Sequence, residues 1–223
     1  MPTNLQTRRI LGYDDLVATA PGTGDEALAD VLTYDATIIS QYNKYDMLPF
    51  TGDSILVRDT VARKLAAVNA ALKARGFRLK VVYGYRHVSV QQAYFGRRRQ
   101  EIQQAMPQLT GKALDKYTHN FVAVPEVAGH PVGGAVDVTI VDAAGRELDM
   151  GTAIADYTDP LAVQTFAGGL NTQQTAHRLL LHDVMVAEEF APFYGEWWHF
   201  SYGDREWAAF YNKKMALYGA IDA

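Results

Sequence analysis

The chain has 223 residues, of which 48% are hydrophobic and 21% charged, a composition typical of one globular domain or of one domain with a helical elaboration. The 21 basic against 25 acidic residues give a net charge of −4, which argues against a nucleic-acid partner because phosphate binding needs a clustered basic face. The chain has no cysteine, which excludes disulfides, thiolate metal sites and a cysteine nucleophile.

The N-terminal part of the chain offers few signals. No apolar run approaches the length of a membrane span, and the first residues lack the apolar core of a signal peptide, so we expect a cytoplasmic protein, or a periplasmic one if the chain is a processed form. Residues 1–24 are polar and predict an arm, and apolar spacing over residues 25–41 predicts a helix. We therefore expect an N-terminal helical lead-in over residues 1–49 and the main domain over residues 50–223.

Regular elements follow in the middle of the chain. Residues 56–75 have the spacing of an amphipathic helix that Gly76 ends, and residues 77–85 read as a strand. Residues 89–105 predict a helix that opens with a capping box at Ser89 and closes before Pro107. Residues 107–133 are mostly irregular, with a short helix expected around residues 112–116.

The second half predicts a strand, a hairpin and two helices. Residues 135–141 alternate, with Val136, Val138 and Ile140 on the core face, and a turn over 142–146 leads to a returning strand over 147–150. After a loop over 151–170, Asn171 caps a helix to about residue 189; residues 197–202 form a strand, and Asp204 caps a last helix that reaches Leu217. The predicted fold is α+β: a small, mainly antiparallel sheet flanked by helices in a single domain.

Two short stretches carry candidate metal ligands. His130, Asp137 and His199 offer two imidazoles and one carboxylate, and catalytic zinc takes three such ligands while keeping one position open. On one uninterrupted strand His130 and Asp137 would point to opposite faces, because their separation is odd. Gly133-Gly134 interrupts that strand, so His130 is expected from the loop and Asp137 from the strand.

Two further side chains have the chemistry of amide hydrolysis. Glu196 follows Gly195 at the bend before the strand that carries His199, where a carboxylate can serve as general base for the attacking water. Arg86 ends the strand over residues 77–85, where its guanidinium can stabilise the oxyanion. The alternative for Arg86 is a buried ion pair.

These residues match the motifs of a known family. His130-x-x-Gly-x-Ala-x-Asp137, Glu196-Trp-Trp-His199 and Gly84-Tyr-Arg86 resemble, in order and spacing, the zinc D-alanyl-D-alanine dipeptidases of the VanX type within the D,D-dipeptidases and D,D-carboxypeptidases. The resemblance covers roughly residues 50–202. It implies one Zn²⁺ per chain held by His130, Asp137 and His199, with Glu196 as base and Arg86 steadying the transition state.

The chain departs from the family pattern around the substrate. The serine two residues before the first histidine is Ala128 here, and Tyr83 and His87 flank the Gly-Tyr-Arg motif in place of Asp and Pro. Where VanX-type enzymes place an acidic residue for the substrate's amine, this chain has Ala155, with Asp156 one place along. The resemblance therefore says less about which substrate is preferred than about which residues bind the metal.

Other aromatic and imidazole side chains are candidates for the site or for the core. Tyr85 is expected to line the substrate pocket or to pack in the core. Trp197 and Trp198 point to opposite faces of the predicted strand, so we expect Trp198 to form a wall of the substrate pocket and Trp197 to pack in the core. The remaining histidines are not expected to bind metal: His87, His119, His177 and His182. For His177 and His182 we expect a position on the surface.

The resemblance implies a zinc-dependent hydrolase that cleaves D-alanyl-D-alanine or a related small D,D-dipeptide in peptidoglycan-precursor turnover, either cell-wall recycling or glycopeptide resistance. The alternatives are a D,D-carboxypeptidase or endopeptidase on longer muropeptides, and a catalytically silent zinc-binding module. The intact Glu196 argues against the silent module, because a silent site needs no base. The expected partner is a small D,D-dipeptide, and the pattern implies no particular oligomeric state.

Overall fold

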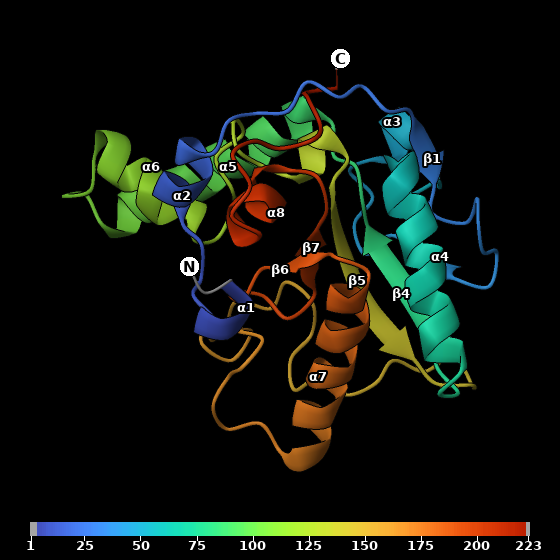
Figure 1. Ribbon diagram of the computed structural model, residues 1–223. Helices are drawn as coiled ribbons and strands as arrows, with labels where there is room; N and C mark the ends of the chain where they lie inside the picture. The colour runs from blue at the N-terminus through green and yellow to red at the C-terminus, as the bar shows by residue number, and fades with distance from the viewer. Residues whose placement is uncertain (1–3, 222–223) are drawn as a thin grey trace.

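The computed structural model describes residues 4–221, in which two β-sheets are combined with helices in an α+β arrangement, as predicted (Figure 1). The larger sheet has the strand order β2 (Ile39–Ser40), β4 (Arg78–Tyr83), β5 (Ala135–Val141), β7 (His199–Ser201) and β6 (Ala191–Pro192). The smaller sheet pairs β1 (Leu28–Asp30) with β3 (Leu56–Arg58). The β2–β4 pair is parallel, and the other pairs of the larger sheet are antiparallel.

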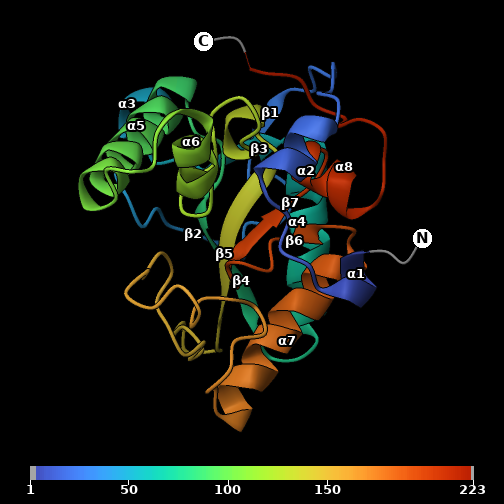
Figure 2. The same ribbon diagram turned by 90° about the vertical axis from the view of Figure 1, so that its left-hand side faces the viewer.

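Helices pack around the larger sheet. The helical segments are α1 (Asn4–Thr7), α2 (Tyr13–Ala18), α3 (Leu48–Thr51), α4 (Asp59–Lys73), α5 (Val88–Ala105), α6 (Gly111–His119), the 3₁₀ turn η1 (His130–Val132), α7 (Thr172–Ala187) and α8 (Arg205–Phe210). Helices α4 and α7 pack on each other beside the sheet, and α5 and α6 form a second pair at the opposite side of the molecule (Figure 2). Within residues 4–221, no helix combines the length and the hydropathy that crossing a membrane requires.

The central strand was predicted with its observed bounds. Strand β5 spans residues 135–141, and Val136, Val138 and Ile140 are fully buried against the hydrophobic core, as the alternation predicts. The opposite face of β5 is covered too, since Thr139 is 1% exposed. Asp137 is the one residue of this strand that keeps partial exposure, which marks where the site opens.

Two predicted helices, α5 and α7, are confirmed with small differences at their ends, and the predicted start of α8 is confirmed. Asn171 caps α7 through a capping box with Gln174, and the Asp204 carboxylate accepts a hydrogen bond from the backbone N–H of Trp207 at the start of α8. Helix α5 begins one residue before the predicted capping box at Ser89, and its N-cap is His87, whose Nδ1 accepts from the Ser89 N–H. The cap differs because an imidazole nitrogen can take the place of the expected hydroxyl oxygen.

The helix predicted over residues 25–41 is wrong. This segment forms β1, a turn and β2, because β1 pairs with β3 and β2 pairs with β4, and these tertiary contacts bury Val31 and Ile38 without a helix. The expected arm contains the short helices α1 and α2, and its residues 1–3 lie outside the described part of the chain. The division of the chain at residue 50 stays a prediction.

Other predicted elements are shorter or longer than expected. The helix predicted over 56–75 divides into strand β3 and helix α4, and Gly76 follows it with a φ of +81°. The returning strand after the 142–146 turn is reduced to a single bridge between Val141 and Glu147, and the last helix ends at Phe210 well before Leu217. Strand β7 spans only residues 199–201 of the strand predicted over 197–202, and α6 is longer than the helix expected around residues 112–116. Strand β6 was not predicted.

One buried side chain ties distant segments to the turn that carries His130. Arg58, which is 3% exposed, donates from Nε to the Val132 carbonyl (2.8 Å), from one terminal nitrogen to the Gly219 carbonyl (2.9 Å), and from the other to the Glu26 carbonyl. Its backbone N–H also donates to the Gly133 carbonyl. A single guanidinium thus satisfies partly buried carbonyls from the N-terminal, central and C-terminal parts of the chain.

We predict that Arg58→Met lowers the free energy of unfolding by about 3 kcal/mol, because three partly buried carbonyl groups lose a charged donor. Chemical denaturation followed by circular dichroism measures this loss. The matched control is Arg146→Met, which removes an exposed ion pair with Asp142 and should change stability by less than about 0.5 kcal/mol. Equal effects of the two substitutions would contradict the role given to Arg58.

Candidate metal centre and active site

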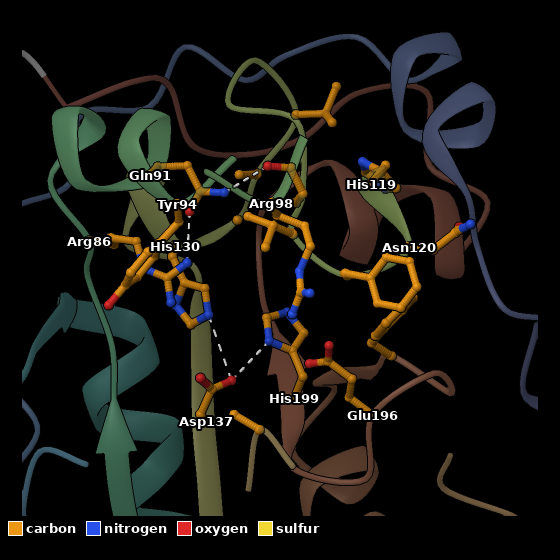
Figure 3. Close-up of a pocket in the computed structure, with 18 of the residues that line it drawn as sticks. Arg86, Gln91, Tyr94, Arg98, His119, Asn120, His130, Asp137, Glu196 and His199 are labelled. Carbon is orange, nitrogen blue, oxygen red and sulfur yellow. Dashed lines mark hydrogen bonds and ion pairs between the residues drawn. The ribbon is translucent and has the colours of Figure 1, made fainter. Parts of the chain in front are cut away.

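Strand pairing places two of the predicted ligands side by side. Asp137 on β5 and His199 on β7 are direct partners in the antiparallel register. Residues opposite each other on neighbouring antiparallel strands project their side chains to the same face. The Nδ1 atom of His199 accordingly lies 3.0 Å from Oδ1 of Asp137 (Figure 3).

The third predicted ligand arrives from the preceding turn, as expected from the glycine pair. His130 begins the 3₁₀ turn η1, and Gly133 ends it in the left-handed region with a φ of +72°. The His130 ring is fixed by a hydrogen bond between Nδ1 and the Gly84 carbonyl (2.8 Å), which identifies Nδ1 as the protonated nitrogen. Its other nitrogen, Nε2, therefore faces Oδ1 of Asp137 at 3.6 Å (Figure 3).

The three residues fit a divalent metal such as zinc. One ligand atom from each of His130, Asp137 and His199 lies within 4.8 Å of the others. Tetrahedral zinc with bonds of about 2.0–2.2 Å requires ligand atoms roughly 3.4 Å apart, close to the 3.0 and 3.6 Å found here. Two imidazoles with one carboxylate are also a donor set that zinc accepts in catalytic sites.

The charge states of His130 and Asp137 suit metal binding. Burial and the nearby Arg86 lower the pKa of His130 to about 4, so its imidazole is neutral at pH 7 and carries a lone pair. Burial alone would raise the pKa of Asp137, but His130 and His199 outweigh it and hold that pKa well below its usual range. A carboxylate that stays ionised and a neutral imidazole are the forms in which both residues bind metals. Burial alone would lower the pKa of His199, but the neighbouring carboxylates of Asp137 and Glu206 outweigh burial and raise that pKa, so metal binding there must displace a proton.

Glu196 lies beside this cluster in the turn that precedes β7 (Figure 3). Its Oε1 accepts a hydrogen bond from the Tyr157 hydroxyl at 2.5 Å, and burial raises its pKa to about 7, while the His199 charge and the Tyr157 hydrogen bond act in the opposite direction. A carboxylate with a pKa near neutrality is suited to take up and release a proton. The structure therefore gives Glu196 the environment of a general base.

Arg86 is buried at the end of β4 and is oriented without an ion pair. Its backbone N–H donates to the His130 carbonyl, and its side chain donates to Oε1 of Gln91 at 2.8 Å. Its Nε has no hydrogen-bond partner although it is buried, and no carboxylate of residues 4–221 forms an ion pair with it. The expected alternative, a structural ion pair, is thus absent from the described residues, and the guanidinium faces the cavity (Figure 3).

All these side chains line one cavity of about 330 Å³, a size within the range of small-molecule sites. Trp198 contributes to its wall as expected, while Trp197 packs in the core and donates to the Thr152 hydroxyl. Tyr85 is placed differently: it is 7% exposed, belongs to the core, and is not among the residues that line this cavity. Its placement is that of a packing residue.

Sequence reasoning missed several residues of the site. Tyr157 comes from the long loop before α7, and Gln91 from the first turn of α5. Glu206 on α8 is buried with Oε2 3.7 Å from Nε2 of His199, and its Oε1 has no partner. Lys44 comes from the segment after β2. None of them belongs to a spaced motif, so only the tertiary structure identifies them.

The four histidines outside the cluster do not join it. His119 lines the same cavity, but its Nδ1 accepts from the Val124 N–H, and His87 caps α5. His177 contacts the Asp149 carbonyl on the surface. The expected surface position of His182 is wrong, because it is 8% exposed and lies against the rings of Phe166 and Tyr194.

The sequence itself matches known proteins. A model of the peptidase M15 family, described as D-ala-D-ala dipeptidase, matches residues 28–218. A D-alanyl-D-alanine dipeptidase of Synechocystis sp. is 34% identical over 108 residues, a match that covers 42% of this chain and 44% of that protein. The chain thus matches less than half the length of this curated relative.

Solved structures show a more distant likeness. VanYB in complex with D-alanine-D-alanine is 17% identical, with a TM-score of 0.49 and coverage of 91% of this chain and 94% of the other. A VanY D,D-pentapeptidase mutant in complex with Zn(II) is 17% identical, with a TM-score of 0.47 and coverage of 91% and 96%. The LD-carboxypeptidase LdcB is 17% identical, with a TM-score of 0.48 and coverage of 87% and 76%.

The α+β fold, the cluster of two histidines and an aspartate, and the partly buried glutamate beside it define the class: a protein with a candidate metal site of the hydrolytic type. The family match extends over most of the chain and includes every residue of this cluster. The chain belongs to the peptidase M15 family, described as D-ala-D-ala dipeptidase.

We predict that His199→Ala removes the bound metal from the purified protein, because Asp137 and His130 alone leave the ion with two protein ligands. Inductively coupled plasma mass spectrometry should find about one zinc ion per wild-type chain and a small fraction of that in the variant. The matched control is His177→Ala, which lies outside the cluster and should keep the wild-type zinc content. Full occupancy in His199→Ala would contradict the ligand assignment.

Proposed function

We propose that this chain is a zinc-dependent peptidase that hydrolyses D-alanyl-D-alanine or a closely related small D,D-dipeptide in peptidoglycan-precursor turnover. The observation that carries this proposal is the position of the partly buried Glu196 next to His130, Asp137 and His199 in one cavity. The family match and the name of the Synechocystis relative support the choice of substrate. A cytoplasmic location stays a prediction.

Zinc is the proposed metal because the donor set contains two imidazoles and one carboxylate and no thiolate. When bound at this cluster, zinc supplies Lewis-acid chemistry to the amide carbonyl and to the attacking water. The protein contributes the fixed geometry of the ligands: Gly84 orients His130 through its carbonyl, and Glu206 faces the ring of His199 from the side opposite Asp137.

Glu196 moves the proton in the proposed reaction. Tyr157 holds its Oε1, which leaves Oε2 to accept a proton from the attacking water. The protonated carboxyl then donates that proton to the amine as the C–N bond breaks. A pKa raised by burial toward 7 favours both transfers, because neither protonation state is strongly disfavoured at neutral pH.

Arg86 is proposed to stabilise the negative charge that develops on the carbonyl oxygen. Gln91 holds one terminal nitrogen of the guanidinium, and the Tyr83 ring lies 4.5 Å from its central carbon. These contacts fix the orientation of a cation that no protein carboxylate neutralises within residues 4–221. A preorganised cation loses little reorganisation energy when charge forms on the substrate, which is the requirement for oxyanion stabilisation.

We take the size and lining of the cavity as support for a small substrate. Its volume of about 330 Å³ is at the lower end for ligand sites, and Ala128 and Ala155 line it with methyl groups where the family pattern has polar side chains. Asp156 accepts from the N–H and hydroxyl of Thr158 and does not line the cavity. A D,D-carboxypeptidase or endopeptidase acting on longer muropeptides is the second candidate.

The test compares hydrolysis of free D-alanyl-D-alanine with hydrolysis of an N-acylated tripeptide that ends in the same two residues, using zinc-loaded protein. We expect a higher kcat/KM for the free dipeptide, measured as released D-alanine. Preference for the acylated tripeptide would replace the proposal by the carboxypeptidase. Hydrolysis of neither would leave a zinc-binding module without this activity.

We predict that Glu196→Gln abolishes turnover, with kcat reduced by at least about 10³-fold, while zinc stays bound, because the amide keeps the shape of the side chain but takes up no proton. Steady-state kinetics and metal analysis of the same preparation separate the two effects. The control Glu147→Gln changes an exposed carboxylate that pairs with Lys80 and should retain wild-type kcat. Retained turnover in Glu196→Gln would exclude it as the base.

A further inference from the structure

Lys44 lines the cavity, but neither the sequence motifs nor the proposed reaction gives this cation a role. It lines the cavity together with Arg86, Arg97 and Arg98, although the chain as a whole carries a net charge of −4. Its side chain is partly buried. Within residues 4–221, its ammonium forms no hydrogen bond or ion pair with a protein group, and its described contact is with the Tyr94 ring at 5.0 Å.

The backbone on both sides of Lys44 is firmly held. Gln41 and Asn43 donate their N–H groups to the carbonyls of Val81 and Val82, so the segment continues the pairing of β2 along β4. On the other side, Met47 is fully buried and its sulfur accepts from the His87 N–H. Lys44 therefore projects from a fixed stretch of chain, and its position in the cavity is built into the fold.

The other cations of the cavity have partners or another task. Arg98 forms an ion pair with Glu101, and Arg97 is exposed at the rim. Arg86 is held by Gln91 at the position proposed for the oxyanion. Burial, together with the charge of Arg86, lowers the pKa of Lys44, while the charges of Asp137, Asp46 and Glu196 act in the opposite direction. Lys44 is thus a partly buried cation that lies near carboxylates but forms no hydrogen bond or ion pair with one within residues 4–221.

A D,D-dipeptide brings an anion to this position. Its carboxylate carbon follows the scissile carbonyl by one residue spacing, about 4 Å. Arg86 and Lys44 contact the same ring, at 5.1 and 5.0 Å from the Tyr94 centroid, so the two cations are neighbours along one wall of the cavity. With the carbonyl oxygen at Arg86, we expect the terminal carboxylate to lie within reach of the Lys44 ammonium.

We propose that Lys44 binds the C-terminal carboxylate of the substrate and so makes a free carboxylate a condition for efficient cleavage. This inference rests on the proposed function and extends it, because it gives the segment before residue 50 a part in substrate recognition. An ammonium that has already lost part of its hydration forms a charge-assisted hydrogen bond with the carboxylate at a reduced desolvation cost. The Tyr94 ring keeps the ammonium in place before the substrate arrives.

The test uses D-alanyl-D-alanine and its C-terminal amide as substrates for wild-type protein and for Lys44→Met. We expect the wild type to prefer the free acid. In Lys44→Met, kcat/KM for the free acid should fall on the order of 10- to 100-fold, mainly through KM, while kcat/KM for the amide should stay within about twofold. Lys44→Arg should recover part of the loss, because it restores a cation.

The matched control is Lys112→Met, which removes an exposed ammonium that contacts the ring of Tyr13 and does not line the cavity. It should leave both substrates unaffected. An equal loss for acid and amide in Lys44→Met would overturn the inference, since it would show a general or structural role. No loss for either substrate would overturn it as well. Zinc content and melting temperature of Lys44→Met should match the wild type.

A binding experiment separates this inference from the proposed function. Calorimetric titration of zinc-loaded Glu196→Gln with D-alanyl-D-alanine and with its amide measures recognition without turnover. If the wild type hydrolyses neither compound, the proposed function fails, yet tighter binding of the acid that disappears in Lys44→Met/Glu196→Gln still supports the role of Lys44. Equal binding of acid and amide, or no binding of either, overturns it.

Discussion

Asp137 and His199 face each other across β5 and β7, and the arrangement of the site follows from this pairing. A register shift of one residue would turn one of the two side chains to the opposite face of the sheet. The register is fixed because Val136, Val138 and Ile140 must enter the core while Asp137 remains at the opening. The hydrophobic core thus determines the geometry of the metal ligands.

The end of β4 extends this control to the other side of the cavity. The Gly84 carbonyl orients His130, and two residues later the backbone of Arg86 donates to the His130 carbonyl. Gly84 itself has no room for a side chain, because a Cβ there would lie 2.5 Å from the Leu56 carbonyl oxygen. One short stretch therefore positions a metal ligand and the proposed oxyanion donor together, which couples metal binding to transition-state stabilisation.

The cavity offers charged groups of both signs to the proposed substrate. Glu196 and Glu206 lie around His199, whereas Lys44 and Arg86 share the Tyr94 ring. A free dipeptide carries a positive and a negative end, and such a pocket orients it by charge before chemistry begins. The anchored segment after β2 is part of this design, so the N-terminal region contributes to function as well as to the sheet.

The sequence by itself determined the central strand, because alternation of apolar residues reports directly which face is buried. It also singled out the candidate metal cluster of His130, Asp137 and His199, because these residues stand in spaced motifs, while the role of Glu196 as base stays a proposal. It did not determine that residues 25–41 form strands, since pairing with β3 and β4 overrides local helical spacing. Likewise, only the tertiary structure shows that Tyr157, Glu206 and Lys44 line the cavity. They reach the cavity from segments far apart in the chain, and no local pattern encodes such a meeting.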